Sequence, residues 1–263
     1  MKEKKKILIT VKTYPVPSKK YDELVCTAGI TEDGEWIRLY PVEFRKLPYA
    51  SRYKKYDLIE AKVEKRTEDF RKESFKPAGH FEFIRHIDTK NNWAERKALI
   101  LNKVKVYTNI KELIKDSKSP DFISLAVFKP TAVLKFIYES QEPHWNKERS
   151  KQLDMFCPNN CKRVKELPFK FKYIFKDETN KIVKLTITDW EVGELFLKYK
   201  KNLKLACEKV KAKYFYDFAK NKDLCFFLGT TKQWHNKSKN PFLIIGTFQP
   251  PEISDDKHIL LPF

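Results

Sequence analysis

Alternating apolar and polar positions mark the first part of the chain. In Asp57–Lys65, the residues Ile59, Ala61 and Val63 fall on one face and mostly charged residues fall on the other. A period of two predicts a strand with one buried and one solvated face. Lys6–Thr13 carries a similar apolar run behind a charged lead, so we expect the first strand there.

A hairpin is expected next. The dipeptide Asp33-Gly34 separates two β-forming stretches, Glu23–Thr31 and Glu35–Tyr40. Asp-Gly favours the tight turn that joins antiparallel strands, so these stretches are predicted to pair. The stretch Arg66–Gly79 shows no period and is expected to be a loop.

Helix signals appear further along the chain. Asn92 and Asn109 each precede residues that favour a helix, which predicts helix starts at both positions. The stretch Thr188-Asp189-Trp190-Glu191 predicts another start, with Thr188 as the cap and Glu191 as its reciprocal partner. Asp189 and Glu191 could alternatively form a catalytic acid pair. Capping explains these residues without chemistry, and we favour it.

The remaining apolar runs complete the expected order of elements. They predict strands at 122–128 and 132–138, a second hairpin from 169–175 and 181–186, helices up to about residue 201 and over 205–219, and strands at 224–228 and 242–248. We divide the chain into a β-rich, barrel-like region with helices (1–140), a linker (141–168) and a ββααββ region (169–263). The predicted class is α+β, with an N-terminal small β-barrel followed by helices and a second mixed αβ half. The barrel is PUA-like or OB-like by analogy.

The charge of the chain changes the functional picture. It carries 54 basic and 35 acidic residues, for a formal charge of +19 spread along its length. A surplus of this size attracts phosphate backbones, which favours a nucleic-acid partner. Only nine of the basic residues are arginines, so a lysine-rich soluble surface is the alternative.

Composition also bears on compartment and cofactors. No apolar run is long enough to span a bilayer, so no membrane partner is expected. The five cysteines are odd in number and scattered, which favours reduced thiols in a cytoplasmic protein. Cys157 and Cys161 lack the second pair of ligands that a structural zinc site needs. We therefore predict no metal site and no cofactor.

One strand carries a pattern with possible nuclease chemistry. Glu60 and Lys62 lie on one face of the strand predicted at 57–65, as in the acidic-x-Lys strand of restriction-type nucleases. There, carboxylates bind Mg²⁺ and the lysine steadies the attacking water. Asp33 is the available second acid. Because a lysine-rich strand produces Glu-x-Lys by chance, these three residues are weak catalytic candidates.

Two groups of residues are candidates for nucleic-acid binding. In the loop after residue 66, Arg71 could bind a phosphate while Glu73 or Ser74 makes a hydrogen bond, although a solvated loop with an Arg–Glu pair is equally consistent. The second group combines aromatic rings with arginines near the ends of strands. If these ends meet at one mouth of the barrel, they form a stacking platform for unstacked bases. The members of this second group are Tyr14, Arg38, Tyr40 and Arg45.

Several motifs together carry a resemblance that runs nearly end to end. They are KTYPVPSKKYDELVCTAGI, EWIRLYPVEFR, DFRKES, TITDWEVGELF and FFLGT with PFLIIGTFQPP. With these motifs the chain resembles an uncharacterised bacterial protein family, and the resemblance implies no catalytic residue. It suggests a Cys/His-rich insertion near the second hairpin in relatives, where this chain has Phe175-Lys176-Asp177.

The favoured function is therefore the binding of nucleic acid, either RNA or single-stranded ends, in nucleic-acid modification or phage defence. One alternative is a Mg²⁺-dependent nuclease that uses the Glu-x-Lys strand. The other is a structural or partner-binding subunit whose lysines reflect composition alone.

Overall fold

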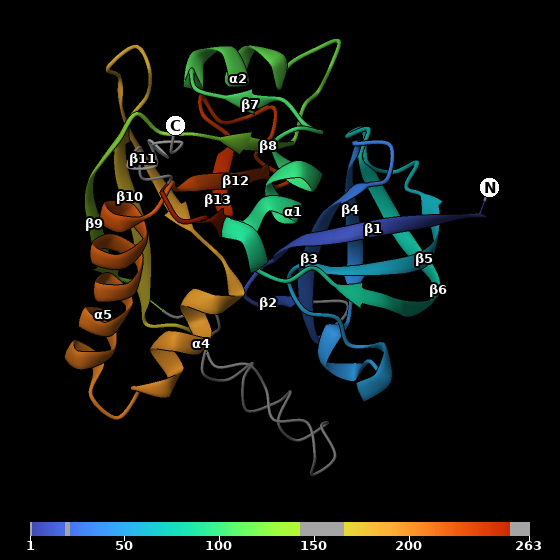
Figure 1. Cartoon of the computed structure of the whole chain (residues 1–263), viewed down its shortest axis with the longest axis horizontal. Coiled ribbons are helices and arrows are strands. Elements are labelled where there is room, and N and C mark those ends of the chain that lie inside the picture. The colour runs from blue at the N-terminus through green and yellow to red at the C-terminus, as the bar shows by residue number, and fades with distance from the viewer. Residues whose placement is uncertain (1, 19–21, 143–165, 253–263) are drawn as a thin grey trace, which may run out of the picture.

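The N-terminal strands close into a barrel. The computed structural model describes residues 2–18, 22–142 and 166–252. The order around the barrel is β1-β5-β6-β4-β3, and β1 closes the ring by pairing with β3 (Figure 1). The predicted α+β class and N-terminal small β-barrel are confirmed. The strands of this sheet are β1 (Lys2–Lys12), β2 (Val16–Ser18), β3 (Asp22–Thr31), β4 (Trp36–Val42), β5 (Asp57–Lys65) and β6 (Ser74–His86).

The alternation seen in the sequence explains how β5 lies in the barrel. Ile59, Ala61 and Val63 are at most 1% exposed and pack in the barrel core, whereas Lys62 is exposed. The turn at Asp33-Gly34 joins β3 to β4 as predicted. The prediction of a loop over 66–79 is wrong for its second part. There, β6 begins at Ser74 and pairs with both β5 and β4.

A second, mixed sheet forms the other half of the molecule. Its strand order is β7-β8-β12-β13-β11-β10-β9, with parallel pairs β7–β8 and β11–β13. The predicted hairpin between β10 and β11 is present. The expected linker at 141–168 falls between β9 and β10, which are neighbours in this sheet. Its residues 143–165, which include Cys157 and Cys161, lie outside the described ranges. The strands are β7 (Val106–Tyr107), β8 (Leu125–Phe128), β9 (Ala132–Ser140), β10 (Phe169–Lys176), β11 (Ile182–Ile187), β12 (Cys225–Thr230) and β13 (Phe242–Phe248).

Helix starts follow the predicted caps only in part. Asn109 caps α2 by accepting hydrogen bonds from the N–H groups of Lys111 and Glu112. The cap of α4 is Asp189 rather than Thr188, because Thr188 donates its N–H to Ile244 O and so continues the pairing of β11 with β13. None of the described helices combines the length and hydrophobicity that a membrane span requires. The helices are α1 (Lys90–Ile100), α2 (Ile110–Asp116), α4 (Trp190–Lys198), α5 (Leu203–Lys211) and the π-helix η3 (Ala212–Ala219); η1 (Phe44–Lys46) and η2 (Tyr49–Ser51) are short 3-10 turns.

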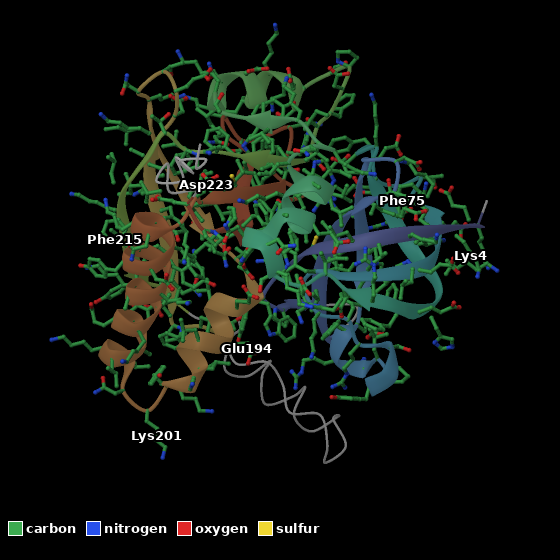
Figure 2. All side chains as sticks on the ribbon, viewed as in Figure 1. Lys4, Phe75, Glu194, Lys201, Phe215 and Asp223 are labelled. Carbon is green, nitrogen blue, oxygen red and sulfur yellow. The ribbon has the colours of Figure 1, made fainter. Side chains whose placement is uncertain are left out.

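The second sheet is buried on both faces. In β12, Phe226 and Leu228 pack with the core beneath α4, α5 and η3, whereas Cys225 and Phe227 pack with outward-facing residues of the barrel. This arrangement places helices, second sheet and barrel in successive layers (Figure 1). Lysines project from opposite parts of the surface, as at Lys4 and Lys201 (Figure 2), so the positive charge is not gathered on one element.

Candidate functional site

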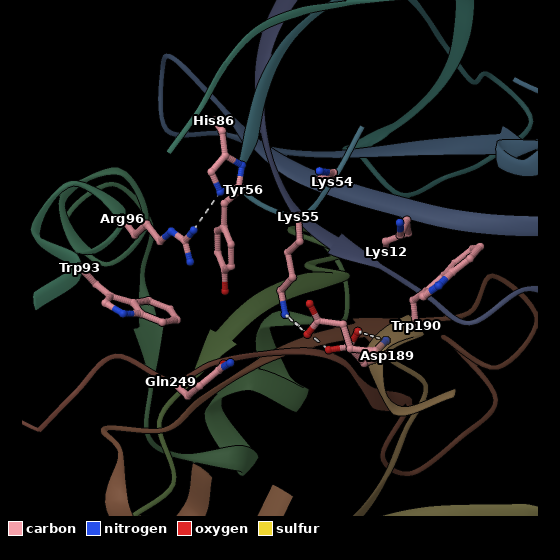
Figure 3. Close-up of a pocket in the computed structure, with 11 residues that line it drawn as sticks. Lys12, Lys54, Lys55, Tyr56, His86, Trp93, Arg96, Asp189, Trp190 and Gln249 are labelled. Carbon is pink, nitrogen blue, oxygen red and sulfur yellow. Dashed lines mark hydrogen bonds and ion pairs between the residues drawn. The ribbon is translucent and has the colours of Figure 1, made fainter. Parts of the chain in front are cut away.

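A cavity of about 450 Å³ lies where the barrel meets the second half of the chain (Figure 3). This volume is within the range of about 300–1,000 Å³ that is typical of ligand pockets. The lining residues come from the end of β1, the segment before β5, the end of β6, α1, the start of α4 and the end of β13. They are Lys12, Lys54, Lys55, Tyr56, His86, Trp93, Arg96, Asp189, Trp190, Glu191 and Gln249.

Backbone pairing brings the end of β1 to the start of α4. Thr13 forms an isolated antiparallel bridge with Asp189, and the N–H of Tyr14 donates to Thr188 O at 2.7 Å. The Tyr14 ring then packs on Gly193, where a Cβ atom would lie only 2.0 Å from a ring carbon. This close approach fixes Lys12 beside the first turn of α4.

A buried ion pair crosses the middle of the cavity. The side chains of Lys55 and Asp189 are 8% and 2% exposed, and Lys55 Nζ lies 3.5 Å from Asp189 Oδ2 and 2.8 Å from Thr247 O. Glu191 Oε2 also lies 3.5 Å from this ammonium group. Burial raises the pKa of Asp189 to about 6, and the nearby Lys55 charge opposes that rise. The positive charge of Lys55 is therefore already balanced by carboxylates of the protein.

Lys12 has a different environment at one end of the cavity. Its Nζ atom lies 4.3 Å from the centre of the Phe44 ring and 4.5 Å from that of Trp190. Burial lowers the pKa of Lys12 against the opposing effect of Glu191 and Asp189. Within the described ranges, neither Lys12 nor the exposed Lys54 forms an ion pair with a carboxylate. Lys12 and Lys54 thus give the cavity two ammonium groups that form no ion pair within the described ranges.

Aromatic and amide groups line the other end. Figure 3 shows Trp93 and Trp190 at opposite ends, with Tyr56 and Lys55 between them. Trp93 lies in the first turn of α1, where its φ of 63° is left-handed, and its ring contacts Tyr56 edge-on. Gln249 points its carboxamide into the cavity, and its buried Oε1 atom has no hydrogen-bond partner. A buried carbonyl without a donor is costly, so a ligand N–H would relieve it.

Arg96 and His86 complete this end. The Arg96 guanidinium lies 3.8 Å from the centre of the Tyr56 ring and donates to Ile87 O at 2.9 and 2.7 Å. His86 Nδ1 lies 2.6 Å from Asp57 Oδ1, and its Nε2 lies 3.3 Å from Arg96 Nη2. The tautomer with hydrogen on Nδ1 fits both contacts, because Arg96 can only donate. The polar groups here are held in fixed orientations.

The structure places Arg71 and Ser74 in a buried cluster away from this cavity. Arg71 binds Asp69 through Nε at 2.8 Å and Nη2 at 2.6 Å, and it donates to Thr230 O at 2.7 Å. Ser74 Oγ donates to Asp69 Oδ2 at 2.8 Å. Burial opposes ionisation of Asp69, but the hydrogen bonds and charge of Arg71 hold its pKa well below the usual range. The predicted alternative of a solvated Arg–Glu pair is wrong, since Arg71 is 5% exposed and pairs with Asp69.

Arg38 and Glu73 belong to the same buried cluster. Arg38 is 4% exposed, and its Nη2 donates to Ser124 O at 3.1 Å and to Ser124 Oγ at 3.0 Å. Glu73 Oε1 accepts from the N–H of Ser124 at 2.8 Å. We name this cluster the arginine interlock; its members are Arg38, Asp69, Arg71, Glu73, Ser74 and Ser124. It ties the barrel to the segment before β8 and to the end of β12.

The four residues predicted to form a stacking mouth have separate partners. Arg38 points to Ser124, whereas Tyr14 packs on α4. The Tyr40 ring stacks under Arg66, whose Cζ lies 5.0 Å from the ring centre. Arg45 is half-buried in η1, and its carbonyl accepts from Arg52. The aromatic and basic groups that do converge are those of the cavity. Among the cavity residues, the sequence motifs had indicated chemistry only for Asp189 and Glu191.

The Glu-x-Lys pair lies on the outer face of the barrel. Glu60 is held by Lys4, with Nζ and Oε1 2.6 Å apart, and Lys62 is exposed. Asp33 lies at the tip of the β3–β4 hairpin as expected. Across the parts of the chain that the structure describes, no three His, Cys, Asp or Glu side chains form a group suited to a metal ion.

Comparison with sequence families covers both halves of the chain. Residues 3–102 match a domain of unknown function (DUF8758), which spans the barrel and α1. No curated protein matches the chain. The predicted resemblance to an uncharacterised family is confirmed, while the bacterial origin of that family stays a prediction. The second match covers 106–261, more than half of the chain, and on this ground the chain belongs to the family described as domain of unknown function (DUF8757).

Proposed function

We propose that this protein binds single-stranded nucleic acid, and that the cavity between the barrel and the second sheet takes one unstacked nucleotide. The observation that carries the proposal is the pairing of aromatic rings with ammonium groups that lack carboxylate partners in the described residues. Bases released from a stack bind aromatic faces and planar guanidinium groups. Phosphates bind cations, and they do so best where the protein has not already neutralised them.

The two ends of the cavity suit the two parts of a nucleotide. Trp93, which is half-buried, offers an indole ring backed by Tyr56 and Arg96, and Gln249 offers a buried carbonyl for the N–H edge of a base. Lys12 lies against Trp190, and Lys12 and Lys54 are the two lining lysines that suit the phosphate. The formal charge of +19 adds non-specific attraction along the strand. Bases in a duplex stay stacked, so a single strand is the better ligand for an enclosed cavity.

Binding of labelled ten-residue oligonucleotides tests the proposal. We expect micromolar or tighter affinity for single-stranded RNA or DNA at about 50 mM salt, weaker affinity for the duplex, and a fall in affinity as salt rises. Trp93→Ala should weaken binding about 5- to 150-fold, since a stacked base contributes ~1–3 kcal/mol. The matched control is Trp234→Ala, because Trp234 is 54% exposed and does not line the cavity.

Two results contradict the proposal. One is the absence of binding at low salt, which favours a structural or partner-binding subunit. The other is an equal loss in both tryptophan variants, which means that the cavity contributes nothing specific. Thermal melts of both variants establish that each is folded before affinities are compared.

A further inference from the structure

Two lysine ammonium groups of the cavity form no ion pair with a carboxylate in the described part of the chain. They belong to Lys12 and Lys54, which both line the cavity. The α4 helix also begins at this cavity, and Asp189 caps its N-terminus, with Glu191 in its first turn. By contrast, the carboxylates of Asp189 and Glu191 are engaged by Lys55.

The position of Lys12 makes its charge unusually dependent on a ligand. Its ammonium group is held between the rings of Phe44 and Trp190, and no hydrogen-bond acceptor contacts it within the described chain. Cation–π contacts compensate only part of the lost hydration of an ammonium group. An anion that enters the cavity would supply the missing oxygen acceptors.

Phosphate chemistry distinguishes the possible anions. A phosphodiester within a strand carries one negative charge, whereas a phosphate monoester carries about −1.5 to −2 at pH 7 and has three strong acceptor oxygens. Two ammonium groups in one cavity, neither of them in an ion pair among the described residues, match the monoester better. A monoester occurs only at the end of a strand, at either its 5′ or its 3′ terminus.

We propose that the cavity recognises the terminal nucleotide of a single strand through its phosphate monoester, with Lys12 and Lys54 as the phosphate-binding residues. This inference rests on the proposed function, since it assumes that the cavity binds a nucleotide. It adds the class of ligand, a phosphorylated strand end, and it assigns opposite roles to the two ends of the cavity. The base lies toward Trp93, and the phosphate lies toward Trp190.

Three versions of one ten-residue RNA, fluorescently labelled at an internal position, test this inference. One carries a 5′-phosphate, one a 3′-phosphate, and one has hydroxyl groups at both ends. We expect one phosphorylated version to bind at least tenfold more tightly than the hydroxyl version. The arm that shows this preference identifies which end the cavity takes.

Lysine variants connect the preference to the cavity. Lys12→Met keeps the apolar stem and should reduce the preference for phosphate to less than twofold, while affinity for the hydroxyl RNA changes little. Lys54→Ala removes an exposed side chain and provides a second variant if Lys12→Met does not fold. Lys237→Met is the control, because Lys237 is exposed in the β12–β13 connection and does not line the cavity; it should keep the full preference.

The outcomes separate this inference from the proposed function. Equal affinity for all three RNAs, together with a loss in Trp93→Ala, overturns end recognition and leaves nucleotide binding in place. A phosphate preference that survives both Lys12→Met and Lys54→Ala also overturns the assignment of these lysines. No binding of any RNA overturns both proposals.

Discussion

The barrel meets the second half of the chain through two groups of charged residues, the arginine interlock and the cavity. In the interlock, Arg71 satisfies Asp69 with two hydrogen bonds and reaches Thr230 O with a third, and Arg38 is bound by Ser124. In the cavity, Lys55 is paired with Asp189, whereas Lys12 forms no ion pair among the residues that the structure describes. By this difference, the interlock charges stabilise the fold, whereas under our proposal the charge of Lys12 is available to a ligand.

The types of residue in the two groups agree with this division. Arginine presents a planar fork that matches a carboxylate, and it suits a buried, permanent contact. Lysine presents a compact ammonium group on a flexible stem, which suits reversible binding of a ligand. The sequence contains only nine arginines, and two of them lie in the interlock. Arginine count therefore indicates little about nucleic-acid binding in this protein.

The largest effect should come from removing Arg71. Arg71→Ala leaves the Asp69 carboxylate buried without its main partner, so we expect a loss of about 3–5 kcal/mol in the free energy of unfolding. Urea denaturation measures this loss, with Lys72→Ala as the control because the Lys72 side chain is 67% exposed. A variant of Arg71 that is fully stable but no longer binds RNA would assign the interlock to the ligand instead.

Asp69 should make the stability of the interlock depend on acid. Its folded-state pKa is lowered, so ionised Asp69 contributes stability above its unfolded pKa of about 4, and this contribution is lost as pH falls through the lower folded pKa. We expect Asp69→Asn to be less stable than wild type by roughly 1–3 kcal/mol at pH 7, and the two to approach each other below pH 3.

The measurement is the free energy of unfolding at pH 7, 5, 4, 3 and about 2, so that it covers the range below the unfolded pKa of Asp69. Glu68→Gln is a suitable control. The Glu68 carboxylate lies next to Asp69 in the sequence, but it is solvent-exposed, and its ion pair among the described residues is with Arg66. An acid dependence in Asp69→Asn that equals that of wild type would mean that other carboxylates dominate.

The sequence predicted elements that depend on local chemistry. The alternation in β5, the turn at Asp33-Gly34, the cap at Asn109 and the β10–β11 hairpin are all present. Each of these features is determined by residues within about ten positions of one another. The cap of α4 was misplaced by one residue because Thr188 pairs with Ile244, more than fifty positions away.

The cavity and the interlock could not be read from the sequence for the same physical reason. Six separate segments supply the cavity, and the pairing of β1 with the start of α4 brings two of them together. The loop residues Arg71, Glu73 and Ser74 looked available for phosphate because nothing local indicates that Ser124 and Thr230 cover them. Only the Asp189–Glu191 segment carried a signal, and helix capping was the favoured explanation of that signal.

Lys12 should behave in the opposite way to Arg71. Replacing it with methionine removes a desolvated charge but keeps the stem packed on Phe44 and Trp190, so the free energy of unfolding should change by less than about 1 kcal/mol. Affinity for single-stranded RNA with the preferred terminal phosphate should fall about tenfold in the same protein. Parallel urea and binding titrations make the comparison. A loss of stability as large as that of Arg71→Ala would place Lys12 among the structural charges.

The smallest effect is expected for the Glu-x-Lys pair on the barrel exterior. Glu60 is bound to Lys4 at the surface, where an ion pair contributes only ~0–1 kcal/mol, and Lys62 is exposed. Glu60→Ala and Lys62→Ala should therefore leave both stability and RNA affinity nearly unchanged. We also expect no cleavage of RNA or DNA by the wild type with Mg²⁺ or Mn²⁺, measured on gels over several hours.

Charged residues such as Lys62 form a third class, beside the interlock charges that stabilise the fold and the cavity charges that we assign to a ligand. Lys62 does not line the cavity, and it forms no ion pair among the described residues, so we assign its charge neither to the fold nor to the site. A metal-dependent cut that disappears in both Glu60→Ala and Lys62→Ala, with folding intact, would reverse this argument. It would mean that residues on the barrel exterior are catalytic. A sequence motif on a strand would then be a better guide to function in this protein than a charged group in a cavity that forms no ion pair.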